Sequence, residues 1–587
     1  MHESRLRPRP GALSVRSLCR SLVTVGIAAA AVLSGGAVNA DNASSRARHL
    51  PGWFGSGPAV HVDSGWVRGN TENGVHQFLG IPYASPPVGD LRWRPPEPPQ
   101  KWSGVLEATE LPNLCAQVTT LGVFAGPASV DEDCLYLNVY TTGMGGRGQG
   151  NSGTKRPVLV WIHGGGSVDG TANDYDGSKL ATGGPLGTDT VTVIINYRLG
   201  LFGYLAHPAL NSEGHPFANY GVLDIQAALR WVQRNIEAFG GDPNNVALGG
   251  QSAGASNTAA NMISPLAAGL FHRAILQSTP TTVYPSLATG LARGSAFAEA
   301  AGCPGDNASA AACLRALTPQ QILGLQGTAN ANGPYVTGPM VDGTVIPLAP
   351  LEAWTSGRFN RVAVMGGNTH DEATFGIGIT EYFTGPPQRP ITAEEYVERV
   401  TRAYSGRAGP GGTLPNYPAG TAEKVLAEYP LSNYGSPFLA FNAVSTDPGA
   451  CRGLKAEQAL AQWVPVYAYQ FNYQDAPYYF PEMPGFDPLA AHTIDIQFLF
   501  PLWHGGILGI AHALNGQETA LSNQLVGYWT RFSGTGNPNG SGLTQWPRFT
   551  PSSQSVLWQD IPSSTVVTAA QQSASHKCDF WNTILVY

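Results

Sequence analysis

The pentapeptide Gly250-Gln251-Ser252-Ala253-Gly254 constrains the fold of this chain more than any other feature. It follows a short apolar run at residues 246–248 and precedes small residues suited to the start of a helix. A G-x-S-x-G sequence between a strand and a helix is typical of a turn so tight that only glycine fits beside the serine, whose hydroxyl is left exposed above the sheet. Because the chain holds 72 glycines, such a pattern can occur by chance, and it indicates a catalytic serine only if the segments around it agree.

The segments around the pentapeptide alternate between strand-like and helix-like patterns. Residues 224–239 repeat apolar positions at helical spacing up to Gly240-Gly241-Asp242-Pro243, and residues 61–68 alternate as expected for one strand. The alternation predicts a doubly wound α/β domain with Ala-rich helical insertions. Continuous apolar runs, typical of parallel strands buried on both faces, predict strands at residues 135–140, 157–162, 191–197, 246–248, 274–276, 362–365 and 464–471.

The first forty residues have the pattern of a secretory signal peptide. Five arginines precede an apolar run at residues 22–33, and small residues then lead to Ala37-Val38-Asn39-Ala40. The apolar run is shorter than the roughly twenty residues that cross a bilayer, which favours a cleaved signal over a membrane anchor. We therefore expect residues 1–40 to be removed, leaving a single domain at residues 41–587 in a secreted protein.

The expected mature chain is acidic. The sequence has 33 Lys and Arg and 40 Asp and Glu; the first forty residues hold five Arg and one Glu, which leaves 28 basic and 39 acidic residues and a net charge of −11. No cluster of Lys or Arg remains. This composition argues against nucleic acid or an anionic membrane as a partner.

The pentapeptide predicts nucleophilic catalysis, which needs further groups. A serine hydroxyl requires a base, usually a histidine oriented by a carboxylate, and in α/β-hydrolases these follow the serine in the order acid, histidine. Backbone donors must also stabilise the oxyanion, and His163-Gly164-Gly165-Gly166, directly after the strand at 157–162, is the candidate for them. An ordinary glycine turn is the alternative. We expect the N–H groups of Gly165, Gly166 and Ala253 as donors, and neither a metal nor a cofactor.

Five further segments match the pattern of one known family. They are Phe78-Leu79-Gly80-Ile81-Pro82-Tyr83-Ala84, Glu132-Asp133-Cys134-Leu135-Tyr136-Leu137-Asn138-Val139, Asn196-Tyr197-Arg198-Leu199-Gly200, Phe239-Gly240-Gly241-Asp242-Pro243 and Cys578-Asp579-Phe580-Trp581-Asn582. Through them and the pentapeptide, the chain resembles the type-B carboxylesterase family, the cholinesterase-like lipase group of α/β-hydrolases, from about residue 58 to the end. The resemblance implies an α/β-hydrolase fold, with a large, mostly parallel central sheet flanked by helices and inserted helical segments over the active site.

The resemblance implies the remaining catalytic residues. Glu372 is the expected acid, in a segment that departs from the family pattern by one extra residue and by Ala373 in place of Gly; its neighbour Asp371 is the alternative. His492 is the expected base, in a segment with Asp where the family has Glu. His504 is the rival histidine, which we expect to be structural.

A second serine also matches the family pattern. Ser278, in Ala274-Ile275-Leu276-Gln277-Ser278, corresponds to a family serine that hydrogen-bonds the acid. The alternative is an ordinary loop serine that follows a strand.

The cysteines predict disulfides. Of the seven, Cys19 leaves with the expected signal peptide, and an even count in an exported chain favours three bridges, although six cysteines allow fifteen connectivities. No C-x-x-C occurs, which disfavours a zinc site. Clustering along the sequence favours two short loops and one long closure, and the resemblance implies the same pairs: Cys115 with Cys134, Cys303 with Cys313, and Cys451 with Cys578.

The departures from cholinesterases bear on the substrate. The loop between Cys115 and Cys134 has no Trp to stack on a quaternary ammonium, Phe124 being its only aromatic residue, and Gln251 and Ser167 replace a Glu and an aromatic residue. Choline esters are therefore disfavoured.

The sequence predicts a secreted serine esterase acting on uncharged carboxylic esters, either small-molecule or lipid. The alternatives are a lipase, a lactone, carbamate or thioester hydrolase with the same triad, and a non-catalytic binding or adhesion module. The sequence leaves the oligomeric state open.

Overall fold

The computed structural model describes residues 47–48, 57–118, 126–144, 155–215, 218–278, 283–327, 335–385, 387–405, 417–506 and 509–585. The expected signal peptide at residues 1–40 and Phe124 lie outside the described residues. Ala47–Tyr587 forms one compact unit.

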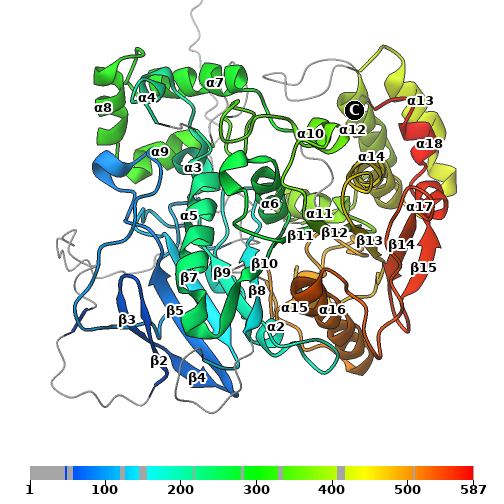
Figure 1. Ribbon diagram of the computed structural model, residues 1–587. Helices are drawn as coiled ribbons and strands as arrows, with labels where there is room; N and C mark the ends of the chain where they lie inside the picture. The colour runs from blue at the N-terminus through cyan, green and yellow to red at the C-terminus, as the bar shows by residue number, and fades with distance from the viewer. Residues whose placement is uncertain are drawn as a thin grey trace, which may run out of the picture. The chain divides into compact units, whose positions relative to one another are not determined.

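A mixed sheet of 11 strands runs through the described part of this unit (Figure 1). The strands from β14 to β9 are parallel neighbours, whereas β15 at one edge and β7, β5 and β4 at the other pair antiparallel. This arrangement confirms the predicted doubly wound, mostly parallel sheet. In spatial order the strands are β15 (Thr565–Thr568), β14 (Ser555–Gln559), β13 (Val466–Phe471), β12 (Ala363–Thr369), β11 (Arg273–Gln277), β10 (Gly241–Gln251), β8 (Arg156–Ile162), β9 (Val191–Ile195), β7 (Tyr136–Thr141), β5 (Val75–Pro82) and β4 (Asn70–Glu72).

A smaller four-stranded sheet contains β1 (Ala47–Arg48), β6 (Val105–Glu107), β3 (Gly65–Arg68) and β2 (Ala59–Val62). The prediction of one strand at residues 61–68 is wrong, because this segment belongs to a hairpin in which β2 pairs antiparallel with β3. The chain reverses at Asp63 and Ser64, where the Asp63 N–H donates to Asn235 Oδ1 (2.8 Å), and Gly65 follows at φ +147°. Apolar alternation continues through the reversal and conceals it in the sequence.

Helices cover the two faces of the large sheet. The helices of the described part are α2 (Ser178–Thr182), α3 (Gly200–Tyr204), α4 (Pro208–Asn211), α5 (Tyr220–Asn235), α6 (Ala253–Ile263), α7 (Leu287–Ala300), α8 (Ala308–Ala316), α9 (Pro319–Gln326), α10 (Pro350–Ser356), α11 (Ala373–Thr384), α12 (Ala393–Tyr404), α13 (Thr421–Glu428), α14 (Pro437–Leu460), α15 (Ile496–Leu499), α16 (Gly516–Thr535), α17 (Ala569–Ser575) and α18 (Cys578–Trp581).

Strand β8 shows how the two faces are filled. Val158, Val160 and Ile162 face one core, which includes α5 and α6, whereas Leu159 and Trp161 face a second core, which includes α16. All five side chains are fully buried. A strand buried on both faces must be apolar at every position, which is why this run was recognisable in the sequence.

The predicted helix at residues 224–239 begins four residues earlier than expected. It is α5, and a 3-10 turn, η4 (Ile236–Phe239), continues it up to Gly240 at φ +82°. Residues 220–226 are all buried, so the first turns of the helix show no polar side and no one-sided apolar stripe. Periodicity therefore could not mark the start.

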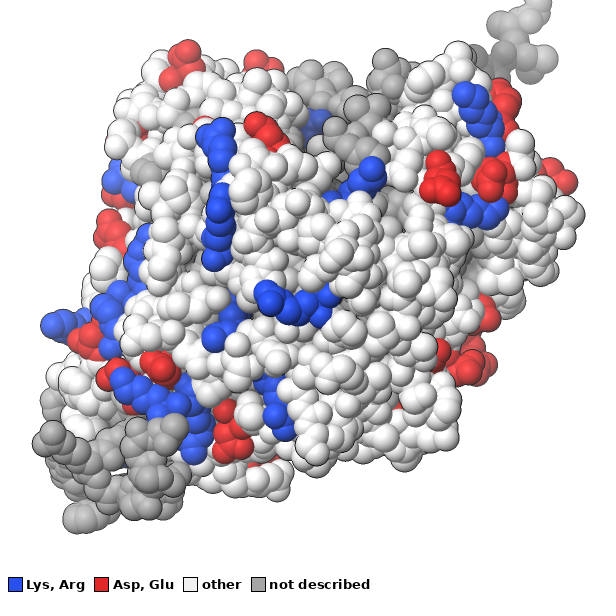
Figure 2. Space-filling view, turned by 45° about the vertical axis from the view of Figure 1, so that its right-hand side comes forward, with Lys and Arg blue, Asp and Glu red and all other residues white. Residues whose placement is uncertain are grey.

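The described residues contain no helix that is both long and apolar enough to cross a bilayer. Figure 2 shows a face on which charged side chains are sparse, in agreement with the 12% of charged residues in the sequence.

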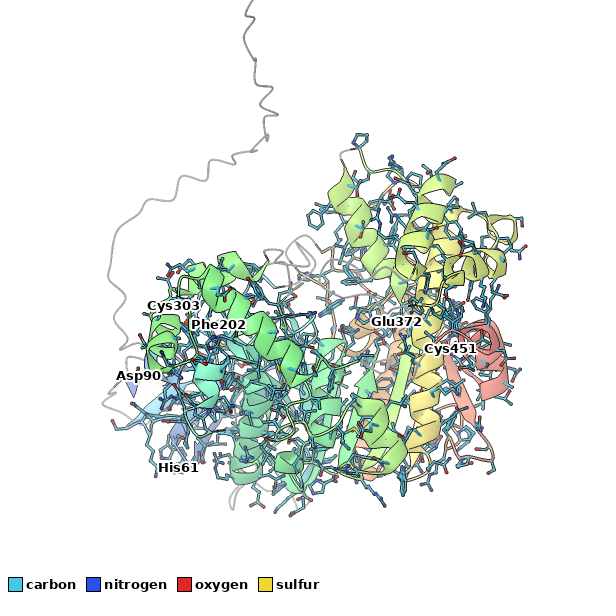
Figure 3. All side chains as sticks on the ribbon, turned by 90° about the horizontal axis from the view of Figure 1, so that it is seen from above. His61, Asp90, Phe202, Cys303, Glu372 and Cys451 are labelled. Atoms are coloured by element: carbon cyan, nitrogen blue, oxygen red, sulfur yellow. A yellow bond between two sulfur atoms is a disulfide. The ribbon has the colours of Figure 1, made fainter. Side chains whose placement is uncertain are left out.

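Three disulfides join Cys115 to Cys134, Cys303 to Cys313 and Cys451 to Cys578, the pairs expected from the sequence. The third bridge spans 127 residues and ties α14 to α18 near the C-terminus. In Figure 3, Cys451 lies on the same side as Glu372, and Cys303 lies on the opposite side.

We predict that the long bridge contributes more stability than the shortest one. Because the loop-closure entropy removed from the unfolded chain grows with loop length, Cys451→Ser/Cys578→Ser should lower the free energy of unfolding by about 5 kcal/mol and Cys303→Ser/Cys313→Ser by about 3 kcal/mol. Urea denaturation of the two double variants and the wild type measures both values. A larger loss from the short bridge would contradict the prediction.

Candidate active site

Ser252 sits at the turn between β10 and α6 in a backbone conformation that L-residues rarely adopt. Its φ is 57° and its ψ is −122°, an arrangement that costs about 1–3 kcal/mol and persists only where the surroundings enforce it. The Ser252 N–H donates to Gln277 O (2.9 Å), and its carbonyl accepts from Ser256 N–H (2.9 Å). These bonds hold the turn to β11 on one side and to α6 on the other.

The flanking glycines are required by close contacts. A Cβ on Gly254 would lie 2.0 Å from Ile162 O, and a Cβ on Gly250 would lie 2.5 Å from the Gly254 carbonyl carbon. Backbone atoms cannot yield as the end of a flexible side chain can, so α6 packs this closely on β8 only with glycine at both positions. The structure thus gives the pentapeptide the strand–turn–helix context of a nucleophile elbow.

Glu372 and His492 meet across the site. His492 Nδ1 contacts Glu372 Oε2, and Glu372 Oε1 accepts from Thr369 N–H (2.9 Å). A neutral imidazole whose Nδ1–H donates to Glu372 carries its lone pair on Nε2. Gln251 Nε2 lies 3.3 Å from that nitrogen, which suits an amide N–H donating to it.

Each member of this pair stabilises the charged form of the other. Burial alone would lower the pKa of His492, but the charge and hydrogen bond of Glu372 outweigh burial and raise it. Burial alone would raise the pKa of Glu372, but the charge and hydrogen bond of His492 lower it. Glu372 is therefore held as a carboxylate that favours the protonated form of His492.

Ser278 has a smaller effect on the acid. It follows β11, is buried, and is one of the groups that lower the pKa of Glu372, after His492. Its Oγ makes no hydrogen bond of full geometry within the described residues.

The alternative residues are engaged elsewhere. Asp371 accepts from Asn442 Nδ2 (2.8 Å) and Gln474 Nε2 (2.9 Å), so Glu372 rather than Asp371 is the carboxylate in contact with His492. His504 Nδ1 donates to Gly506 O (2.7 Å).

His163 is a structural part of the glycine turn. It is buried against Tyr197, and burial lowers its pKa to about 4. His163 is therefore neutral.

The expected oxyanion donors lie beside the serine. Gly165 and Gly166 have φ values of +104° and +61°, and a Cβ on Gly165 would lie 2.1 Å from Asp169 O. Within the described residues, neither N–H donates to a backbone or side-chain acceptor. Ala253 is the first residue of α6, so its N–H also has no acceptor within the helix.

Two cavities reach Ser252. The first, of about 50 Å³, is lined by His492, Gln251, Gly164 and Gly165 together with Ser252. The second, of about 510 Å³, is lined by Gly166, Ser167 and Ala253 together with Ser252. The catalytic roles of these residues remain a prediction, but the structure brings all of them to one place.

A third cavity, of about 360 Å³, contains none of the predicted site residues. It is lined by Asp90, Glu213, Arg315 and alanines of α8, and Glu213 is paired with Arg315 (2.8 Å). Figure 3 shows Asp90 far from Glu372 in that view.

Sequence reasoning gave no role to three charged groups near the serine, of which only Asp495 was noted, as a departure from the family pattern. Asp495 is buried next to the pair, and burial followed by the charge of Glu372 raises its pKa to about 7. Asp174 lines the smaller cavity and Arg293 the larger one. No local pattern marks the last two residues, since each reaches the site through tertiary packing.

Comparison with known proteins decides the family. The model of the "Carboxylesterase family" matches residues 56–581. The chain belongs to this family. It is 32% identical to "Pyrethroid hydrolase Ces2e" of Rattus norvegicus over 521 residues, which cover 85% of both chains. It is also 32% identical to "Cocaine esterase" of Oryctolagus cuniculus over 513 residues, which cover 84% of this chain and 90% of the relative.

A solved structure of "PNB esterase" matches with a TM-score of 0.68 and 29% identity, covering 89% of this chain and 100% of that one. The fold is therefore the α/β-hydrolase fold, as the resemblance implied. The family and its members further indicate that the chain is a carboxylic ester hydrolase.

We predict that Glu372→Gln moves the pH profile in a defined direction. A base must be neutral to accept a proton, so kcat/KM should rise as pH passes through the His492 pKa, which Glu372 holds above its usual value of 6.5. Removing the carboxylate lowers that pKa, so the acid limb should shift to lower pH while kcat falls by about 10⁴-fold.

The pH dependence of kcat/KM for the wild type and Glu372→Gln tests this shift. Glu237→Gln, at an exposed partner of Lys155, is the matched control and should leave the limb in place. An unchanged limb in Glu372→Gln would show that Glu372 does not set the charge state of the base.

Proposed function

We propose that this chain is a secreted serine esterase that hydrolyses uncharged carboxylic esters through an acyl-enzyme on Ser252. Ser252 Oγ attacks the ester carbonyl carbon while His492 Nε2 takes the hydroxyl proton. The carbonyl oxygen becomes an oxyanion that accepts from Gly165, Gly166 and Ala253 N–H. His492 then gives its proton to the departing alkoxide, and water releases the acid in a second round of the same steps.

One observation supports this proposal most strongly. His492 and the strained Ser252 border the same cavity, and Glu372 contacts His492, although the three residues come from segments far apart in the sequence. A buried carboxylate that orients an imidazole beside a serine at an elbow is the arrangement that activates a hydroxyl. A binding module has no need for it.

The positions of the two cavities suggest where each part of the ester binds. The general acid must reach the leaving oxygen, so the alcohol part belongs in the cavity of about 50 Å³ beside His492. The acyl part then enters the cavity of about 510 Å³, to which the buried Ser167 contributes. We infer a preference for bulky acyl groups joined to small alcohols.

The names of the relatives are compatible with other acyl substrates. One is named "Fatty acyl-CoA hydrolase precursor, medium chain" (Anas platyrhynchos), which keeps a thioester among the alternatives. Lipid esters, lactones and carbamates would use the same Ser252 chemistry. A non-catalytic adhesion module is disfavoured by the intact Ser252, Glu372 and His492.

Export is supported by two features. The first forty residues have a signal-like pattern, and three disulfides occur in the described part, as in proteins of oxidising compartments.

We predict that a fluorophosphonate probe labels the wild type on Ser252 and that Ser252→Ala removes both labelling and esterase activity, the latter by about 10⁶-fold. Mass spectrometry of the labelled peptide identifies the modified residue. Ser256→Ala is the matched control, because Ser256 borders the larger cavity only four residues away and should not be required for labelling. Labelling of Ser252→Ala at the wild-type rate would remove the proposed mechanism.

A further inference from the structure

The two cavities that meet at Ser252 carry opposite charges. Arg293, on α7, is the one charged side chain among the described residues that line the larger cavity. Asp174, at the end of η3 (Ala172–Asp174), lines the smaller cavity with Ser252 and His492. A substrate bound across Ser252 therefore has a positive group beside its acyl part and a negative group beside its alcohol part.

The wall of the larger cavity contains further polar residues beside Arg293. Ser256, Thr337 and Tyr284 line it, and the Tyr284 hydroxyl donates to Ser256 O (2.6 Å). Tyr335 also lines it, and its buried hydroxyl has no hydrogen-bond partner within the described residues. An acyl cavity built only for alkyl chains would have no use for an unsatisfied hydroxyl, because burying one without a partner costs free energy.

Arg293 is suited to a carboxylate. Arginine has five N–H donors in a planar fork that matches the two oxygens of a carboxylate. Arg293 makes a contact within the protein, and a guanidinium with five N–H donors can hold a protein contact and a ligand carboxylate together.

Asp174 is a half-buried negative group. Within the described residues, its carboxylate forms no hydrogen bond and no ion pair, and burial raises its pKa to about 6, an effect that the charge of His504 reduces. The carboxylate side of the Glu372–His492 pair adds negative charge at the same end of the site. An anionic alcohol group would therefore be repelled from the smaller cavity.

We propose that the site selects esters by where they carry negative charge: a carboxylate at the far end of the acyl group binds beside Arg293, whereas a carboxylate in the alcohol part is repelled by Asp174. The favoured substrates are monoesters of dicarboxylic acids with a small neutral alcohol. This inference rests on the proposed esterase function and extends its substrate class beyond uncharged esters.

The orientation of the substrate cannot be reversed to avoid this selection. Only a leaving oxygen in the smaller cavity lies beside His492, so turning the ester round would leave the alkoxide without a proton donor. The position of His492 therefore fixes the orientation of the ester, and the position of the negative charge then decides whether the ester is favoured or repelled.

The test compares pairs of esters that differ by one non-hydrogen atom, at pH 8, where Asp174 is ionised. The first set contains the monomethyl esters of succinic, glutaric and adipic acid, which carry the free carboxylate in the acyl part. Each is compared with the methyl ester in which a carboxamide replaces that carboxylate. The second pair is 4-acetoxybutanoate and 4-acetoxybutanamide, which carry the group in the alcohol part. For each pair, the readout is the ratio of kcat/KM for the acid to that for the amide.

For the wild type, we expect the best member of the first set to give a ratio of about 10 to 100 and the second pair a ratio below about 0.1, as for charge-assisted contacts in a buried site. Arg293→Gln should bring the first ratio to about 1, and Arg293→Lys should retain part of it. Asp174→Asn should bring the second ratio toward 1. The control Arg402→Gln, at an exposed arginine of α12, should change neither ratio.

The outcomes separate this inference from the proposed function. If the wild type hydrolyses the amides but shows no preference in any member of the first set, or if Arg293→Gln lowers acid and amide rates equally, charge selection is overturned and the esterase stands. If the second ratio is unaffected by Asp174→Asn, the repulsion is overturned. If no ester is hydrolysed, the esterase function fails and the inference fails with it.

Discussion

The packing of α6 against the end of β8 is the contact on which the rest of the site depends. Gly250 pairs with Ile162 in the parallel register of β10 and β8, so the loops that follow both strands leave from the same edge of the sheet. One loop is the glycine run that contains Gly165, and the other is the turn at Ser252. Because Gly254 admits the Ile162 carbonyl at a distance no Cβ would allow, the serine and its expected amide donors lie side by side.

Glu372 and His492, the proposed acid and base, are brought to this edge by a separate set of contacts. Asp371 N–H donates to Ala490 O (3.0 Å), Asp371 forms an isolated bridge with Ala491, and its carboxylate accepts from Asn442 of α14. The residue beside the acid therefore ties the acid loop to the histidine loop and both to α14. Since α14 also carries Cys451, the long disulfide supports the same region. The C-terminal part of the chain thus positions the proposed proton-transfer groups, and the sheet positions the proposed nucleophile.

The features predictable from the sequence are those with a local physical signature. Strands buried on both faces must be apolar throughout, and an elbow needs glycine at two fixed positions, so β8, β9, the central part of β10 and the turn at Ser252 were predicted directly. The hairpin of β2 and β3 was missed because one alternating pattern runs through both strands. The start of α5 was missed because its first turns are buried on every side.

The charges around the serine could not be predicted in this way. Asp174 and Arg293 lie on elements that pack beside the site only in the folded chain, and neither belongs to a motif. The contact of Gln251 with His492 was also not foreseen, although Gln251 was noted as a departure from cholinesterases. The family resemblance supplied Glu372 and His492, which composition and periodicity alone do not distinguish from other acidic and histidine residues.

The most direct test of this account is a crystal structure of the enzyme after reaction with a phosphonate ester. The account predicts phosphorus bonded to Ser252 Oγ, with its oxygen roughly 2.7–3.1 Å from the amide nitrogens of Gly165, Gly166 and Ala253, and His492 Nε2 facing the bonded oxygen. An adduct on another residue, or a phosphoryl oxygen turned away from these amides, would contradict it.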